Sequence, residues 1–406
     1  MPHVIHVLRK FEPREWGGIE THLVGLIPEL TRLGWTSEVH APREAGTDGA
    51  PLHEVGAKLT TFRAHYPYLG LTSERRSRLV AAGGNLLSVE EAWRLMRAPR
   101  ADMIHVHTLG RLGGVVRTIA RMRRVPYAVS LHGPVRADAA VVERDATART
   151  RGMVDLGAPL GMLLGARRVV TDADLVFTLN RSEHAAWVGE RAGKHLSLVA
   201  HGINPSQAAR GERRDARASV PGLGDARYAI IVARLDRAKG QDVAIEAFAR
   251  SAPVDMHLVL AGAAVDPTFE HQLRALAART PRVHVLGGVP PRTARALLAE
   301  ATLALVPSVA EPFGLVLLEA WAEGTPALAS AVGGLQDIAR TAGAEAILVR
   351  GGPEAWGARM AEWLADDRIL ARERHEGPGR VARSYSWRAL AEQTVAAYAS
   401  AARRAS

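Results

Sequence analysis

Two glutamates stand in the segment best suited to hold a ligand. Glu311 and Glu319 have seven residues between them, in a run that follows a buried strand and opens an apolar helix. Such a strand–loop–helix junction directs free backbone N–H groups and the positive end of the helix dipole toward a bound phosphate. Gly314 would let a ligand approach the backbone closely. The two carboxylates could accept hydrogen bonds from hydroxyls on either side of that phosphate, although a helix cap at Glu311 and a solvated Glu319 would explain the same pattern.

Two cations follow the first strand of the second half. Arg234 and Lys239 come shortly after the apolar run Tyr228–Val232. In open α/β sheets ligands bind beyond the carboxyl ends of the strands, so both side chains would lie where they can neutralise a diphosphate. Lysine is rare here, with four among 52 basic residues, which indicates that a compact ammonium group is wanted at Lys239. A basic surface loop is the alternative interpretation.

A glycine pair occupies the turn after the first strand of the chain. Gly17 and Gly18 lie between the strand Val4–Leu8 and an amphipathic helix. Backbone without side chains permits close approach of a phosphate or sugar. Ordinary turn geometry explains the pair equally well, so it supports a site only together with other residues.

Three histidines lie near the ends of predicted strands. His105 and His107 alternate on one strand and could hold a metal ion from one face, but the sequence offers no third ligand. His132 is followed by a glycine and a proline that end its strand, and it is the better catalytic candidate.

The triplet Asp172-Ala173-Asp174 has the spacing by which many sugar transferases hold a divalent metal on a diphosphate. Here it only precedes the apolar strand Leu175–Leu179, and polar residues at a strand start are the favoured interpretation. We therefore predict no catalytic metal.

Short apolar runs alternate with helical patterns through most of the chain, which is typical of parallel sheets built from βαβ units. The length of 406 residues fits two domains. We therefore expect an α/β fold with two Rossmann-like domains whose parallel sheets face an interdomain cleft. The predicted strands are Val4–Leu8, Thr36–His40, Met103–Val106, Tyr127–Leu131, Leu175–Leu179 and Ser197–Ala200, then Tyr228–Val232, His257–Leu260, Val283–Leu286, Leu303–Val306, Ala327–Ser330 and Ala346–Val349.

The polar stretch Asn204–Asp225 is the best candidate for a linker. We predict an N-terminal acceptor domain over residues 1–204, a C-terminal donor domain over 205–385, and a last helix over 386–406 that crosses back to the first domain. Within the first helix, Pro28 is expected to cause a kink. The segment His65–Arg100 interrupts the alternation and resembles an insertion that faces the acceptor.

Composition limits the remaining classes. The chain is 47% hydrophobic and has no cysteine, no apolar run long enough for a membrane span and no signal peptide at its start, so we expect a cytoplasmic protein. The net charge is +10, yet aromatic residues make up only 5%, which argues against nucleic-acid binding. Arg117, Arg121 and Arg124 recur on one side of a helix and suggest a peripheral contact with the inner membrane face, with a solvated surface as the alternative.

Taken together, these residues resemble retaining glycosyltransferase family 4, with the GT-B fold. The resemblance covers nearly the whole chain. Its motifs are Gly17-Gly18-Ile19-Glu20, Ser130-Leu131-His132-Gly133, Ala200-His201-Gly202-Ile203-Asn204, Arg234 with Lys239-Gly240, the Glu311 to Glu319 segment and Ser384-Tyr385-Ser386-Trp387. Two positions depart from the family pattern, where asparagine and aspartate are usual at His201 and Asn204.

The resemblance implies a role for each matching residue. Arg234 and Lys239 would contact the donor diphosphate, and departure of the nucleoside diphosphate would rely on their charge. Glu319 would bind the ribose and Glu311 the donor sugar. His132 would lie beside the transferred sugar. The remaining donor contacts would come from the backbone or side chains of Gly17, Gly18, Val289, Phe313, Gly314, Leu315 and Val316.

The predicted activity is retaining, metal-independent transfer of a sugar from a nucleotide diphosphate sugar, with a UDP-sugar favoured, onto the hydroxyl of a glycan, lipid or small-molecule precursor. The donor is a co-substrate, and no further cofactor is expected. An epimerase or a phosphorylase on the same fold is an alternative enzyme, and a noncatalytic nucleotide-sugar-binding protein is an alternative of another class. An absolute requirement for an acceptor would separate transfer from these.

Overall fold

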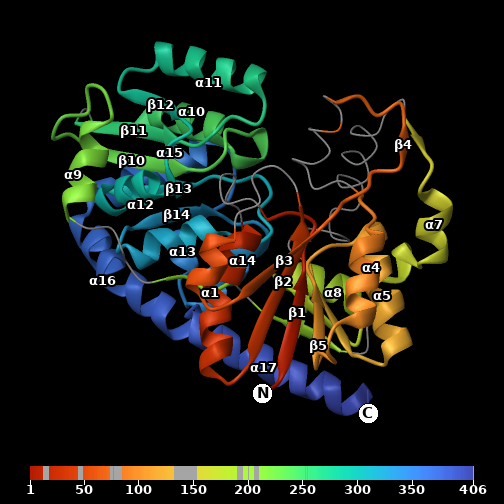
Figure 1. The fold of residues 1–406 in the computed structure, drawn as a ribbon. Helices are drawn as coiled ribbons and strands as arrows, with labels where there is room; N and C mark the ends of the chain where they lie inside the picture. Colours follow the sequence, from red (N-terminus) through yellow and green to blue (C-terminus); the bar gives the residue numbers. More distant parts are fainter. Residues whose placement is uncertain are drawn as a thin grey trace. The chain divides into compact units, whose positions relative to one another are not determined.

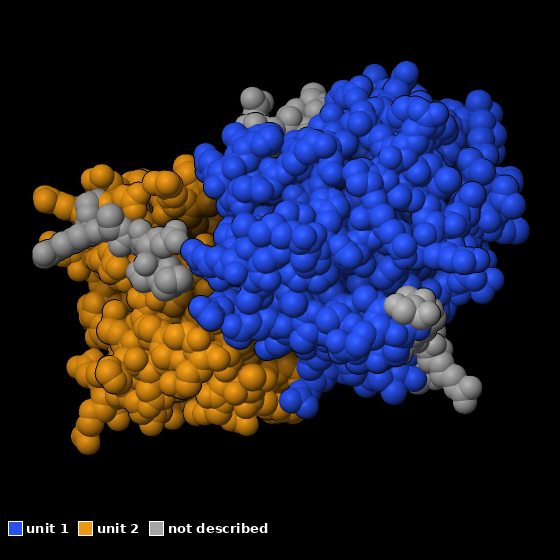
Figure 2. All heavy atoms as spheres, turned by 60° about the horizontal axis from the view of Figure 1, so that its bottom comes forward, with its two compact units in different colours: residues 1–202, 387–406 blue, residues 203–386 orange. Residues whose placement is uncertain are grey.

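The computed structural model describes residues 1–11, 18–43, 49–73, 76, 85–131, 153–189, 195–199, 201–204, 210–251, 253 and 255–405. The chain divides into two compact units (Figures 1 and 2). Unit 1 consists of residues 1–202 and 387–406, and unit 2 of residues 203–386. Each unit is built on its own parallel sheet with helices on both faces, so the predicted fold class is confirmed.

Unit 1 is built on a seven-stranded parallel sheet in the order β3-β2-β1-β5-β6-β8-β9. A separate antiparallel pair, β4-β7, joins two distant segments. The strands are β1 (His3–Val7), β2 (Thr36–Pro42), β3 (Lys58–Phe62), β4 (Tyr68–Leu69), β5 (Met103–Val106), β6 (Tyr127–Ser130), β7 (Val154–Asp155), β8 (Leu175–Thr178) and β9 (Leu196–Leu198).

Both faces of the central strands are buried, which explains why they read as apolar runs. Val4 and Met103 pack into one cluster with Leu26 of the first helix, while their neighbours Ile5 and Ile104 pack into a second cluster on the opposite face. Successive side chains on a strand point to opposite faces, so this division follows directly from the sequence.

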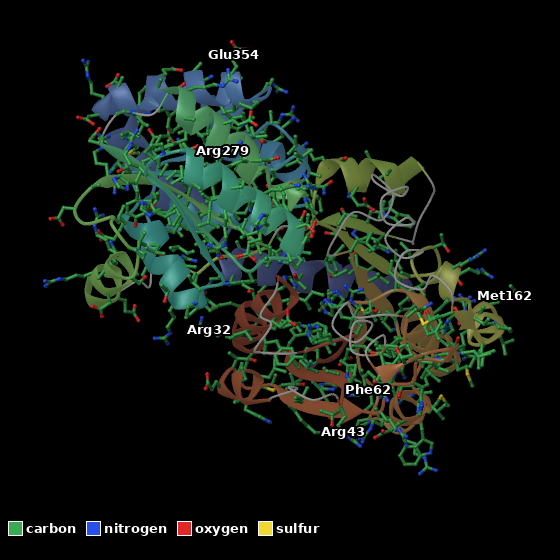
Figure 3. All side chains as sticks on the ribbon, turned by 90° about the horizontal axis from the view of Figure 1, so that it is seen from above. Arg32, Arg43, Phe62, Met162, Arg279 and Glu354 are labelled. Atoms are coloured by element: carbon green, nitrogen blue, oxygen red, sulfur yellow. The ribbon has the colours of Figure 1, made fainter. Side chains whose placement is uncertain are left out.

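The helices of unit 1 cover these two clusters. Helices α1 and α17 pack against each other on one face, and α4 and α5 on the other (Figure 1). Met162 of α7 is 80% exposed and lies at the periphery (Figure 3). The helices are α1 (Gly18–Arg32), α2 (Ala50–Glu54), α4 (Val89–Arg97), α5 (Gly110–Arg123), α7 (Ala158–Leu163), η2 (Ala166–Arg168), α8 (Arg181–Gly189) and α17 (Trp387–Ala405).

Unit 2 is built on a six-stranded parallel sheet in the order β12-β11-β10-β13-β14-β15. The chain order reverses between β10 and β13, which is the switch point where open α/β sheets bind ligands. The strands are β10 (Arg227–Val232), β11 (Met256–Ala261), β12 (Val283–Gly287), β13 (Leu303–Val306), β14 (Ala327–Ser330) and β15 (Leu348–Val349).

Helices α10 and α15 pack together in unit 2, as do α9 with α12 and α13 with α16. The helical elements are α9 (Arg210–Ala218), η3 (Arg237–Lys239), α10 (Gln241–Ser251), α11 (Pro267–Arg279), α12 (Pro291–Glu300), α13 (Leu315–Ala322), α14 (Gly333–Thr341), η4 (Glu345–Ile347), α15 (Pro353–Ala365) and α16 (Asp367–Ser384). Figure 3 labels Arg279 at the end of α11 and Glu354 near the start of α15.

Two local expectations were wrong, and one strand was not predicted. The segment interpreted as a linker contains α9, whose polar sequence packs on α12. The supposed insertion contributes Leu86 and Leu95 to the core of unit 1, so it belongs to the fold. β3 was not predicted, because it lies at the sheet edge and reads half-polar.

The last helix returns to unit 1 as predicted. Trp387 is only 6% exposed and lies against two glycines, because a Cβ atom built on Gly25 or Gly202 would fall within 2.4 Å of its indole ring. Further along α17, Tyr398 is fully buried beside Trp35. Among the described residues, no helix combines the length and apolar character needed to cross a membrane.

Candidate functional site

The loops that follow β10 and β13 are held together at the switch point of unit 2. The Val309 N–H donates to the Ala238 carbonyl over 2.9 Å. Gly240 packs so closely on the Pro307 carbonyl that a Cβ atom would lie 2.1 Å from that oxygen, and its φ is +66°. Asp236 starts the short helix η3 by accepting from the Ala238 N–H. These contacts fix the backbone from which Lys239 projects.

Lys239 and Glu311 form an ion pair across these two loops. The Lys239 Nζ lies 2.6 Å from Glu311 Oε2, and Ser308 Oγ donates to the same carboxylate oxygen over 3.3 Å. The two side chains are 21% and 14% exposed, respectively. Residues that are 72 positions apart therefore meet at one place, with one cation and one anion still accessible to a ligand.

The N-terminus of α13 lies directly after this pair. Gly314 adopts φ 110° and ψ 46° at the N-cap, a left-handed conformation that favours glycine. Leu315 and Val316 begin the helix and are half-buried, while Phe313 is buried with its ring 6.4 Å from that of Tyr385. The first amides of a helix have no partner within it, so they are donors suited to an anion.

Two glycines that the sequence analysis overlooked pack against the backbone of the Glu311–Phe313 loop. Gly333 and Gly334 open α14, and the Gly334 N–H donates to the Glu311 carbonyl over 2.9 Å. A Cβ atom on Gly333 would lie 2.3 Å from the Glu311 carbonyl oxygen, and one on Gly334 would lie 2.3 Å from that of Phe313. The sequence shows this glycine pair after the strand β14, but only the packing shows that it supports the Glu311–Phe313 loop.

Replacing Gly334 by alanine is expected to displace the Glu311–Phe313 loop, because the new methyl group would meet backbone that cannot rotate away. We expect turnover to fall at least tenfold while the melting temperature changes by a few degrees. Initial rates and thermal unfolding would measure both. Gly352→Ala is the control for a glycine change in the same unit, since nothing lies within 4 Å of a Cβ atom there and its φ of −85° is one that alanine adopts without strain. Equal activity of the two variants would contradict the supporting role.

Glu319 lies on the second turn of α13 beside two further charges. The Arg295 Nη1 lies 3.9 Å from Glu319 Oε1, and Arg295 Nε donates to Glu323 over 2.5 Å. Burial raises the pKa of the Glu319 carboxyl; Arg295 lowers it and Glu323 raises it again. The Glu319 side chain is 28% exposed, so a ligand can reach it. Its buried part has a charged partner in Arg295, which a carboxylate in such surroundings needs.

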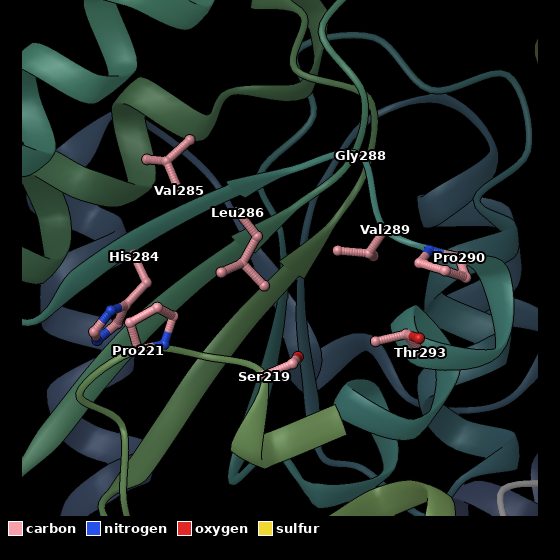
Figure 4. Close-up of a pocket in the computed structure, with 9 residues that line it drawn as sticks. All are labelled: Ser219, Pro221, His284, Val285, Leu286, Gly288, Val289, Pro290 and Thr293. Atoms are coloured by element: carbon pink, nitrogen blue, oxygen red, sulfur yellow. The ribbon is translucent and has the colours of Figure 1, made fainter. Parts of the chain in front are cut away.

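Arg234 and Val289 complete the predicted residues of unit 2. Arg234 is exposed just beyond β10, where Gly262 allows β11 to approach so closely that a Cβ atom would lie 1.9 Å from the Ala233 carbonyl. Val289 lines an open hollow of about 570 Å³ between the edge strand β12 and the start of α12 (Figure 4). The hollow is lined mainly by apolar and neutral polar side chains, including Leu286, Pro290 and Thr293.

Unit 1 carries the other predicted residues. Gly18 is the exposed first residue of α1. Gly17 and His132 lie outside the described residues, so their predicted roles stay predictions.

The histidine cluster has the third member that the sequence analysis missed. His6 of β1 joins His105 and His107 of β5 and the loop after it, with ligand atoms that all lie within 4.8 Å of one another. Burial lowers the pKa of His6 to about 3, with His3 adding to the effect, so its ring is neutral. All three rings make hydrogen bonds, because His6 Nδ1 lies 3.1 Å from His107 Nε2 and His105 bonds Tyr398 and Ser130. These contacts tie the sheet to α17.

The Asp172–Asp174 triplet has structural partners, as the favoured interpretation expects. Asp172 accepts from Arg117 over 2.7 Å, and Asp174 accepts from the Tyr127 N–H over 3.1 Å. Arg117 is only 12% exposed and is paired with Asp172, so it is not one of the surface cations that could contact a membrane.

Two Rossmann-like units, with a phosphate-suited helix start at the switch point of the second, define the GT-B fold. Known structures agree with this fold. Anabaena HepE in complex with UDP and glucose has a TM-score of 0.71 at 18% identity, covering 98% of this chain and 100% of that one. WaaG, a glycosyltransferase involved in lipopolysaccharide biosynthesis, has a TM-score of 0.63 at 19% identity, covering 96% and 98%.

The chain belongs to the glycosyltransferase group 1, family 4-like, proteins. Residues 212–383 match the glycosyl transferases group 1 family, and residues 17–196 match the glycosyl transferase 4-like domain. The D-inositol 3-phosphate glycosyltransferase of Geodermatophilus obscurus is 30% identical over 95% of this chain and 85% of its own length. That of Catenulispora acidiphila is 30% identical over 76% and 74%. The predicted family and activity are thereby confirmed: the protein is a retaining glycosyltransferase that uses a nucleotide-sugar donor.

Proposed function

We propose that this enzyme transfers a hexose from a UDP-sugar to a hydroxyl of a phosphorylated polyol, through a donor site formed by unit 2 without a metal ion. The ion pair between Lys239 and Glu311, at the start of α13, is the observation that carries the proposal. It brings a cation for the diphosphate and a carboxylate for the sugar hydroxyls to the amides of one helix N-terminus. UDP is bound to one of the similar structures, which supports uridine as the base.

The residues of unit 2 divide between the parts of the donor. Arg234, Lys239 and the amides of Gly314 and Leu315 stabilise the charge that develops on the departing diphosphate. Glu311 accepts from the donor sugar, and Glu319 accepts from the ribose. Val289, at the edge of the hollow, lies beside the base, and Phe313 and Val316 shape the sugar site. The acceptor attacks from the face that the diphosphate leaves, and its proton passes to that phosphate.

The acceptor domain is proposed to be unit 1. By the family resemblance, we propose that Gly17 and Gly18 bind the diphosphate and that His132 contacts the transferred sugar. Two of the most similar relatives are named for D-inositol 3-phosphate, which supports a phosphorylated polyol as the acceptor class. A pocket lined by Arg63, His65 and Arg76 offers two guanidinium groups for such a phosphate. A cytoplasmic location with a peripheral membrane contact stays a prediction.

Thermal unfolding with UDP, GDP and ADP, each with and without chelator, tests the donor site. A ligand at about 100 times its Kd adds about 2.7 kcal/mol, so one diphosphate should raise the melting temperature by roughly 5 to 10 °C. We expect UDP to do so, with no effect of EDTA, because two protein cations and a helix N-terminus balance the charge of the diphosphate.

The matched variant in this experiment is Glu319→Ala, which should weaken stabilisation by UDP while leaving the unliganded melting temperature nearly unchanged. Stabilisation that disappears with EDTA would contradict a metal-free site. The absence of stabilisation by every diphosphate at millimolar concentration would contradict the proposed donor site altogether.

A further inference from the structure

Arg295 is held in one orientation by contacts on two sides. It lies on α12 with a side chain that is 22% exposed. Its Nε donates to Glu323 Oε1 over 2.5 Å, and its Nη2 donates to the Asn204 carbonyl over 3.3 Å. The planar guanidinium is therefore fixed, and its remaining nitrogen, Nη1, lies 3.9 Å from Glu319 Oε1.

This geometry matters because Glu319 needs a charge partner. The helix that carries it is apolar, with Leu317, Leu318 and Trp321 buried beside it. A carboxylate in such surroundings is driven toward its neutral form, and a neutral carboxyl group is a poorer hydrogen-bond acceptor than an ionised one.

Among the described residues on the elements packed against α13, Arg295 is the cation that faces Glu319. On α16, Arg380 pairs with Glu373 and Glu376 and lies over the Trp321 ring. Strands β13 and β14 carry no charged residue. From α9, Arg213 approaches Glu323 at 4.0 Å. Glu323 itself is an anion that opposes ionisation of Glu319.

We propose that Arg295 is a positioning residue, which keeps Glu319 ionised and aimed so that its carboxylate accepts both vicinal hydroxyls of the donor ribose. The inference rests on the proposed role of Glu319 in the donor site. It assigns a task to a side chain on a different helix, which acts on the donor through the Glu319 carboxylate. In consequence, the preference of the enzyme for ribose over deoxyribose depends on Arg295.

The test compares the Kd of UDP with that of 2′-deoxy-UDP, measured by calorimetry on the full chain. Wild-type protein should prefer UDP by about tenfold to a hundredfold, since a hydroxyl bound to a charged acceptor is lost in the deoxy ligand. Arg295→Gln should reduce this preference to within about threefold while changing the Kd of 2′-deoxy-UDP little. Arg295→Lys should keep part of the preference. Arg292→Gln is the matched control, because this residue lies on the same helix with a side chain that is 90% exposed.

The pH dependence of this preference gives a readout that a merely structural role would not change. Burial raises the pKa of Glu319 and Arg295 lowers it, so the loss of Arg295 raises it further. Because the preference needs the ionised carboxylate, it should disappear on acidification at a higher pH in Arg295→Gln than in wild-type protein.

The outcomes separate the inference from the proposed function. A full preference for UDP in Arg295→Gln, or an equal weakening of both ligands, would overturn the role of Arg295 alone. A wild-type enzyme that binds both diphosphates equally would overturn the ribose contact of Glu319 and the inference with it. If Arg295→Gln does not fold, the same two measurements are made on Arg295→Lys and Arg295→Met. A full preference for UDP over 2′-deoxy-UDP in Arg295→Met, with the pH dependence of wild-type protein, would overturn the inference.

Discussion

Replacing Lys239 by alanine is expected to lower kcat by about 10²–10³-fold, the range found when one donor to a developing negative charge is removed. The ammonium group lies 2.6 Å from Glu311 at the switch point of unit 2, and no other lysine lies in this unit. Steady-state rates with a UDP-sugar and a phosphorylated polyol would measure the loss. Because the pair is partly exposed, the free energy of unfolding should change by less than about 1 kcal/mol.

The control for Lys239→Ala is Arg237→Ala. Arg237 lies on the same short helix, but it is exposed and bonds Gln272 of α11 instead of the Glu311 carboxylate. Removing it takes away the same formal charge from the same loop. If both variants lost activity equally, the effect would come from general electrostatics, and the specific role of Lys239 would have to be abandoned.

Among the substitutions proposed here, Trp387→Ala is expected to lower the free energy of unfolding most, by about 3 to 5 kcal/mol, as is usual for removal of a buried tryptophan. The indole fills the space left open by Gly25 and Gly202, and the His22 ring meets it edge-on at 6.0 Å. Its Nε1 is buried without a hydrogen-bond partner among the described residues, so the loss is one of packing. Chemical denaturation followed by circular dichroism would measure it.

Trp93→Ala is the matched control for Trp387→Ala, because Trp93 of α4 is 55% exposed and should cost little. Stabilisation by UDP should persist in Trp387→Ala below its melting temperature, since the proposed donor site is formed by unit 2 and Trp387 belongs to unit 1. Unchanged stability would show that α17 contributes little to the core of unit 1.

The sequence predicted the strands well where both faces are buried. β5, β13 and β14 match their predicted bounds at both ends, because a strand covered on both sides must be apolar throughout. Other strands of the two sheets differ from their predicted bounds by small extensions or shortenings. β3 was missed for the opposite reason, since an edge strand with Thr60 and Thr61 half-buried gives no such signal. The polar helix α9 was missed because charged helix formers read as a linker when no apolar stripe is evident.

The candidate site was predicted residue by residue, but not as an arrangement. Arg234, Lys239, Glu311, Gly314 and Glu319 were recognisable because each stands at a strand end or a helix start, and such positions are local features of the sequence. The supporting residues were not recognisable in the same way. Gly334, Arg295 and His6 act through contacts with segments that lie far from them in the chain.

The sequence by itself determined the alternation of strands and helices, the residue types at their ends and therefore the class of ligand that the chain can hold. These features follow from periodicities of a few residues. Only the tertiary structure decided that Lys239 meets Glu311, that Arg295 faces Glu319 and that Trp387 packs on Gly25. Such pairings depend on strand order and helix packing, which bring together side chains that no local pattern connects.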